Sequence, residues 1–151
     1  MVTLVPLADA DRAAAEALRV APGQERFVSS VVESLREAAE HPDARPICWV
    51  IHAAALPVGF AMVADEVDSP EYLPHFLWKL LIDQDHQHRG HGTAALDLIV
   101  DHFRTCSTAE ALTTSARPGP GSPIAFYERY GFARTGEVHD GDVLLRLPLP
   151  R

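Results

Sequence analysis

The sequence predicts a single α/β domain spanning residues 1–151, with a mixed central sheet of about seven strands and four helices on both faces. Its 151 residues, 47% hydrophobic and 23% charged, suit one soluble globular domain. Apolar residues recur with period 2 in some segments and period 3.6 in others, in the order β-α-α-β-β-β-α-β-α-β-β. A run of consecutive strands inside this order favours a mixed sheet with helices on both faces.

The N-terminal third alternates strand and helix signals. A short strand is expected at 3–7, and Asp9 is placed to cap a helix that runs to about Val20. The next helix is predicted by apolar residues at helical spacing, namely Val28, Val31, Val32, Leu35 and Ala39. Two strands, 47–51 and 57–64, follow around a short turn.

The central stretch reads as an apolar strand at 77–82, a polar turn, a glycine loop and a helix. The helix is predicted by an apolar stripe, Leu96, Ile99, Val100 and Phe103. Gly90 and Gly92 lack side chains, so a ligand can approach the backbone of the loop. The loop opens into the helix, whose first N–H groups and dipole favour anions, and Arg89 adds a positive charge. This pattern predicts a site for a diphosphate.

The C-terminal part predicts a strand, a short helix and a closing hairpin. The strand is expected at 111–116, and Ser122 caps the helix, which has Pro123 at its first position. Gly131 ends this helix, and the hairpin strands are expected at 132–136 and 143–149.

Two other interpretations compete for the glycine loop. Residues 90–95 fit the dinucleotide fingerprint G-x-G-x-x-A, but 83–89 separate them from the strand end that this fingerprint needs. His86, His88 and His91 form H-x-H-x-x-H, which suggests zinc. Helical zinc ligands favour i, i+4 spacing, and no cysteine lies nearby, so basic side chains beside a phosphate explain the histidines better. No metal is expected.

Two motifs resemble the GCN5-related N-acetyltransferase (GNAT) family. Residues 87–92 match its acetyl-CoA loop, Q-x-x-G-x-G, between the expected fourth strand and third helix. Residues 127–132, Y-E-x-x-G-F in pattern, are similar to a second family segment. The order of elements also matches the family along nearly the whole chain. The resemblance implies a GNAT fold and acetyl-CoA as co-substrate. Locally, 77–83 is similar to the diamine and polyamine acetyltransferases.

The resemblance also implies residue roles. Tyr127 matches the tyrosine that protonates the departing thiolate, and a phenol of pKa about 10 is a plausible acid for a thiol of pKa about 8.5. Pro120 stands where many members carry asparagine, so Ser122 or the backbone must serve instead. The expected acetyl-CoA-binding residues are Leu80, Leu81, Ile82, Gln87, His88, Arg89, Gly90, His91, Gly92, Thr93 and Ser122.

The general base is harder to place. Some members use a glutamate early in the fourth strand, and Phe76 occupies that position here. Asp83 is the candidate adopted, with Glu71, His75 and Glu33 as others; solvated surface charge is the default expectation for each of them.

The expected function is acetyl transfer to the primary amine of a small molecule. Alternatives are acetylation of a protein or peptide N-terminus or lysine, and a non-catalytic acyl-CoA sensor. A net charge of −8 argues against a nucleic-acid partner and weakly favours a cationic substrate. No segment approaches the ~20 apolar residues of a membrane span. Cys48 and Cys106 are isolated, which predicts reduced thiols in a cytoplasmic protein. Relatives commonly form dimers, so a homodimer is one expected assembly.

Overall fold

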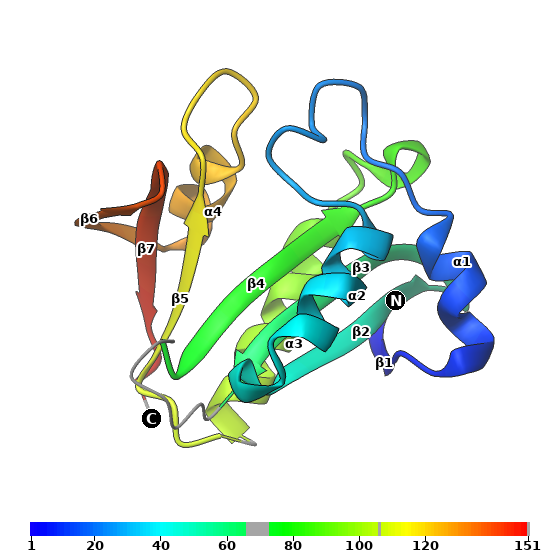
Figure 1. The fold of residues 1–151 in the computed structure, drawn as a ribbon, viewed down its shortest axis with the longest axis horizontal. Coiled ribbons are helices and arrows are strands. Elements are labelled where there is room, and N and C mark those ends of the chain that lie inside the picture. The colour runs from blue at the N-terminus through cyan, green and yellow to red at the C-terminus, as the bar shows by residue number, and fades with distance from the viewer. Residues whose placement is uncertain (66–72, 106, 151) are drawn as a thin grey trace.

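A computed structural model describes residues 1–65, 73–105 and 107–150, and it shows one seven-stranded sheet between two layers of helices (Figure 1). Neighbouring strands are antiparallel except β4 and β5, which are parallel. The predicted mixed α/β fold is therefore confirmed. Across the sheet, the strands are β1 (Val2–Pro6), β2 (Pro46–Ala53), β3 (Leu56–Asp65), β4 (His75–Ile82), β5 (Ala111–Ala116), β7 (Asp142–Pro148) and β6 (Ala133–His139).

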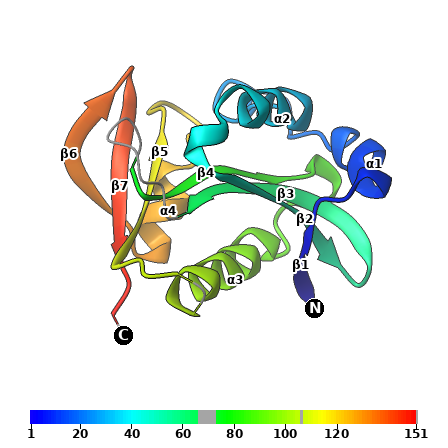
Figure 2. The ribbon, with the colours of Figure 1, turned by 60° about the horizontal axis from the view of Figure 1, so that its bottom comes forward.

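Within the described residues, four α-helices cover the sheet, with α1 and α2 on one face and α3 and α4 on the other (Figure 2). They are α1 (Arg12–Glu16), α2 (Val31–Glu40), α3 (His91–Thr105) and α4 (Ile124–Tyr130). Three 3-10 turns accompany them, Asp9–Asp11, Pro42–Ala44 and Gln84–His86. No helix in the described ranges is long and apolar enough to cross a membrane.

The first helix is shorter than the sequence predicts. It ends at Glu16 rather than near Val20. The Arg19 backbone N–H donates to Asp83 Oδ1 at 2.8 Å, and the Arg19 carbonyl accepts from the Gln84 N–H at 2.6 Å. These bonds to the segment after β4 take the groups that a longer helix would use, so tertiary contact overrides the helical preference here.

The second helix starts at Val31 because Ser30 caps it. The Ser30 hydroxyl accepts from the Glu33 N–H at 3.1 Å, and the Glu33 carboxylate accepts from the Ser30 N–H at 3.2 Å. This reciprocal capping box fixes the start of the helix and leaves Val28 in the preceding loop.

The core lies on both faces of the sheet. The predicted α3 stripe is buried: Leu96, Ile99 and Phe103 are fully covered and pack onto the sheet. Burial of side chains of this size contributes about 1.5–3 kcal/mol each. On the other face, Val31 of α2 packs with Phe60 and neighbouring strand residues. The helix layers on the two faces therefore cover β4, the central strand of the sheet.

Two irregularities of β4 shape the molecule. A bulge leaves Trp78 without a partner, because Met62 pairs with Lys79 and Val63 pairs with Leu77. As a result, Trp78 and Lys79 both face α2, where regular alternation would separate them. In addition, β4 pairs with β5 only at Phe76–Thr113 and Leu77–Thr114, and the two strands then diverge (Figure 1).

Candidate active site

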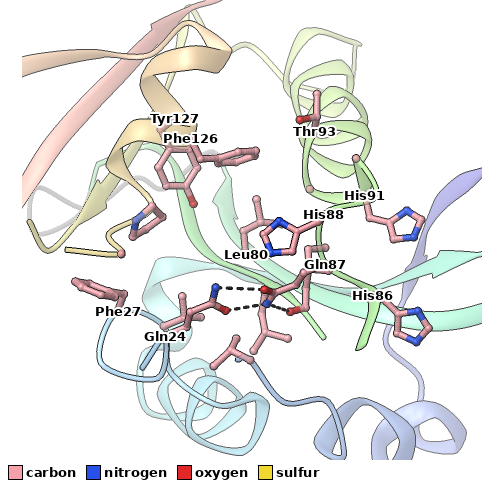
Figure 3. Close-up of a pocket in the computed structure, with 18 of the residues that line it drawn as sticks. Gln24, Phe27, Leu80, His86, Gln87, His88, His91, Thr93, Phe126 and Tyr127 are labelled. Atoms are coloured by element: carbon pink, nitrogen blue, oxygen red, sulfur yellow. Dashed lines mark hydrogen bonds between the residues drawn. The ribbon is translucent and has the colours of Figure 1, made fainter. Parts of the chain in front are cut away.

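A cavity of about 430 Å³ lies where β4 and β5 diverge (Figure 3). The end of β4, the glycine loop, the first turn of α3 and the start of α4 form its walls. Nine of the residues expected to bind acetyl-CoA line it, namely Leu80, Leu81, Ile82, Gln87, His88, Gly90, His91, Gly92 and Thr93. Residues far apart in the sequence therefore converge on one cavity.

The glycine loop presents its backbone to this cavity. His88 and Gly90 have φ values of 63° and 81°, in the left-handed region. A Cβ added at Gly90 would meet no atom within 4 Å, so that side of the loop is open. α3 starts at His91, and the Ala94 N–H is the first to bond back, to the Gly90 carbonyl at 3.0 Å. Helix geometry leaves the N–H groups before it available to an anion.

Gln87 lines the cavity and also holds the loop in place. Its side-chain amide nitrogen donates to the Ile82 carbonyl at 2.9 Å and to Gln24 Oε1 at 2.7 Å. In return, Gln24 Nε2 donates to Gln87 Oε1 at 3.2 Å (Figure 3). Gln87 therefore ties the loop to β4 and to the segment between α1 and α2.

Two residues expected to bind acetyl-CoA do not line the cavity. Arg89 is exposed and is absent from the cavity walls. Ser122 donates to the Arg117 carbonyl at 2.6 Å and accepts from the Ile124 N–H at 3.3 Å. Its hydroxyl thus orders the turn between β5 and α4, which is a structural role.

Tyr127 of α4 directs its hydroxyl into the cavity (Figure 3). Its side chain is buried between the rings of Phe126 and Phe132, whose centroids lie 5.3 and 5.4 Å away. Burial raises the pKa of the phenol to about 12, although a hydrogen bond with Thr114 acts in the opposite direction. The phenol is therefore protonated throughout the physiological range and can donate a hydrogen bond or a proton.

A second cavity, of about 450 Å³, adjoins the first on the α2 side of β4. The residues that line both cavities are Phe27, Val28, Leu80, Pro123 and Tyr127. The second cavity is the more polar of the two, with the charged residues Glu25, Arg26, Glu37, Lys79, Arg117 and Asp142 on its walls. Two ligands, one in each cavity, would meet beside Tyr127.

Phe27, which lines both cavities, packs against the turn between β5 and α4. A Cβ added at Gly119 or Gly121 would lie 3.7 or 3.6 Å from the Phe27 ring. The segment before α2 therefore packs onto the turn between β5 and α4. Gly119 and Gly121 have φ values of 139° and 84°, which favour glycine in that turn. Sequence reasoning missed this contact, together with Gln24 and Val28, because nothing in the local pattern places the segment at the site.

Among the described residues, the candidate bases Asp83, Glu33 and His75 line neither cavity. Asp83 Oδ1 and Oδ2 accept from the N–H groups of Arg19 and Asp85, at 2.8 and 3.3 Å, so this carboxylate caps a turn. Glu33 belongs to the α2 capping box, where the bonds to Ser30 lower its pKa. Glu71 lies outside the described residues. The geometry therefore gives the predicted base role of Asp83 no support.

His75, the remaining candidate, lines neither cavity and belongs to a largely buried polar cluster. Its Nδ1 lies 3.1 Å from Asp65 Oδ1, which also accepts from Ser107 at 2.9 Å. The other carboxylate oxygen lies 3.0 Å from His102 Nε2. This cluster joins β3, β4 and α3. In the part of the chain that the structure describes, no three His, Cys, Asp or Glu side chains form a group that could hold a metal.

Comparisons with known proteins agree with this geometry. The family model described as acetyltransferase (GNAT) domain matches residues 44–134. No curated protein sequence matches the chain. Among solved structures, an acetyltransferase from Thermus thermophilus aligns over 99% of this chain and 97% of that chain, with 20% identity and a TM-score of 0.76.

Two further structures share the fold. The ribosomal-protein-S18-alanine N-acetyltransferase from Escherichia coli aligns over 100% of this chain and 96% of that chain, with 22% identity and a TM-score of 0.71. The aminoglycoside acetyltransferase AAC(6′)-Ib, in complex with coenzyme A, aligns over 98% and 95%, with 18% identity and a TM-score of 0.76. At such identities, the similarity establishes a common architecture.

Proposed function

This chain belongs to the GNAT acetyltransferase family, and we propose that it moves the acetyl group of acetyl-CoA to the primary amine of a small molecule, with Tyr127 as general acid. The observation that carries the proposal is the position of Tyr127. This residue lines both cavities, so one phenol would contact both substrates if each cavity holds one of them.

The first cavity fits acetyl-CoA in shape and chemistry. The diphosphate would bind the N–H groups between His88 and Thr93, where the backbone is open and α3 begins. The pantetheine arm would run along β4 beyond Leu77, where β5 has separated and backbone groups can pair with an added extended chain. The thioester would then reach the junction of the cavities.

The reaction proceeds by direct attack. The amine nitrogen, after losing its proton to solvent or a base, forms a bond to the thioester carbon, and a backbone N–H of β4 stabilises the oxyanion. The carbon–sulfur bond then breaks. The Tyr127 hydroxyl hydrogen-bonds the departing sulfur and supplies its proton, and the proton released by the new amide nitrogen restores the phenol through solvent. The products are an N-acetyl amine and coenzyme A.

Two alternative functions would give different results in an assay of acetyl transfer. The same architecture serves an enzyme named for a protein alanine and another named for aminoglycosides, so a peptide N-terminus or lysine is the second acceptor class. A non-catalytic acyl-CoA sensor would bind acetyl-CoA without releasing thiol.

The proposal is tested by measuring thiol release from acetyl-CoA with panels of polyamines, aminoglycosides, amino acids and peptides. Saturable release with a small amine, and an acetylated product of the expected mass, is the expected result. Release with peptides alone would show that the acceptor is a peptide and not a small amine. Tight acetyl-CoA binding with no release across all panels would favour the sensor.

A further inference from the structure

Lys79 is the only lysine in the chain, which otherwise uses arginine for its basic residues. It lies in the second cavity, and its side chain is only 15% exposed. Glu37, Asp142 and Arg117 on the same walls are 40%, 38% and 58% exposed. The deepest charge of this cavity is therefore an ammonium group.

The β4 bulge is what brings Lys79 there. In a regular strand with Trp78 in the ladder, Lys79 would lie on the same face as Leu77 and point into the apolar core on the α3 side. With the bulge it points towards α2, beside Leu80, which lines both cavities. One backbone irregularity thus places a cation next to the junction where acetyl transfer is proposed.

The Lys79 ammonium has bonding capacity left for a ligand. It donates to Ser29 Oγ at 3.0 Å and lies 2.9 Å from Glu37 Oε2. The contact with Glu37 has ion-pair distance only, since Glu37 Oε2 receives no hydrogen bond from any described residue. An ammonium group has three N–H donors. Ser29 and Glu37 account for two of them among the described residues, which leaves a third N–H for a ligand.

The other charges of the cavity do not favour a cationic chain. Arg117 and Asp142 pair with each other at 3.3 Å. Glu25 and Arg26 are exposed neighbours at the rim, and the Arg26 guanidinium lies 5.0 Å from the centre of the Phe27 ring. The six charges sum to zero, so the cavity has no excess negative charge for a polyamine, whose second ammonium would meet Lys79.

From this geometry we infer that the acceptor is an amine that also carries a carboxylate, and that Lys79 binds the carboxylate while the amine faces the thioester. A zwitterionic amino acid matches a cavity of zero net charge, and its carboxylate would accept the spare Lys79 N–H as a charge-assisted hydrogen bond. The inference rests on the proposed function and narrows its substrate class away from diamines and polyamines.

A direct test uses the single lysine as a reporter. Protein labelled with ¹⁵N-lysine has one side-chain ammonium signal, and it is titrated with β-alanine or glycine and with the corresponding carboxamides, in the presence of coenzyme A. The expected result is a saturable shift of the Lys79 signal with the carboxylates and none with the amides. Equal shifts with acids and amides, or no shift with the acids, would overturn the inference without touching acetyl transfer itself.

A kinetic test compares acids with amides in the thiol-release assay. We expect kcat/KM for the acid to exceed that for its amide by about tenfold or more, because a charge-assisted bond is worth about 1.5–3 kcal/mol. Lys79→Met should abolish this preference, Lys79→Arg should retain part of it, and Arg36→Met, which removes an exposed charge of α2, should retain all of it. Wild-type turnover of amides or polyamines in preference to acids would refute the inference while supporting the proposed acetyl transfer.

Discussion

Gln24 and Gln87 exchange two side-chain hydrogen bonds, at 2.7 and 3.2 Å, across 63 positions of the sequence. Both residues line the first cavity, and the residues that follow Gln24, 25–29, border the second. The pair therefore joins two walls of the first cavity, and the glutamine of Q-x-x-G-x-G positions the loop that it opens.

The first prediction concerns this pair. Gln87→Ala should raise the Kd for acetyl-CoA by about fivefold or more, because each lost hydrogen bond costs about 0.5–1.5 kcal/mol and the loop loses two partners. Gln24→Ala should have a smaller effect. In a double-mutant cycle the two changes should couple by at least about 0.5 kcal/mol. Gln84→Ala, an exposed change on the same segment, is the control. Strictly additive effects of the two changes on the binding free energy would show that the bonds between Gln24 and Gln87 do not couple the two segments.

The second prediction concerns the glycine loop. Gly90→Ala should weaken acetyl-CoA binding, because the new methyl group enters the open side of the loop and α-left geometry costs a residue other than glycine about 1–2 kcal/mol. Gly23→Ala separates the two effects: Gly23 has φ +90° and equal free space but does not line the cavity. Both variants should lose similar stability in thermal unfolding, and only Gly90→Ala should change the Kd. A Kd for Gly90→Ala identical to that of the wild type would show that the loop is not part of the acetyl-CoA site.

The third prediction concerns Tyr127. Tyr127→Phe should lower kcat by about 10²-fold or more, the usual contribution of a positioned acid, and leave the Kd for acetyl-CoA near that of the wild type. Because burial raises the pKa of this phenol to about 12, its ionisation should produce no loss of kcat below pH 11. Tyr130→Phe, which removes a 2.7 Å bond to Asp97 outside both cavities, is the matched control. An unchanged kcat in Tyr127→Phe at saturating substrates would refute the acid role.

The fourth prediction concerns alkaline stability. Burial raises the pKa of Cys48 from 9.0 to about 11, and that of Tyr127 from 10.0 to about 12. Between these values the unfolded chain has released protons that the folded chain keeps, so the free energy of unfolding falls as pH rises. The contribution of Cys48 is complete below pH 9 and is lost by about pH 11. Urea unfolding between pH 8 and 11 should therefore show a steeper decline for the wild type than for Cys48→Ala. Parallel declines would exclude the thiol as a cause.

The sequence predicted most of the fold because its main signals are periodic and local. The α3 stripe, the end of α4 at Gly131 and the strand at 111–116 depend on spacing and on turn residues, and the structure has all three. The start of α4 differs from the prediction, because Pro123 is the N-cap and the helix begins at Ile124. The end of α1 could not be predicted in this way, because Arg19 leaves the helix to bond with Asp83, 64 positions away. Because this bond joins positions that are far apart, no residue near Asp83 in the sequence indicates that its carboxylate already has a partner.

The second cavity could not be predicted from the sequence for a related reason. Residues 77–82 read as a continuous apolar strand with one lysine, and no local signal marks the bulge at Trp78. Glu37 falls on the polar side of its helix and reads as solvated. Their approach to within 2.9 Å depends on the packing of α2 against the sheet. The first cavity was accessible to sequence reasoning because one continuous segment, 80–93, builds most of it.

The divergence of β4 and β5 has a thermodynamic consequence for the living cell. The ladder between β4 and β5 has only two residue pairs in the described residues, with side-chain bonds from Thr113 and Thr114 to the carbonyls of His75 and Leu77. An acyl carrier seated between the strands would supply the missing rungs of this ladder. Ligand binding of this kind stabilises the native state by RT ln(1 + [L]/Kd), so the rigidity of the C-terminal third would follow the cellular supply of acetyl units.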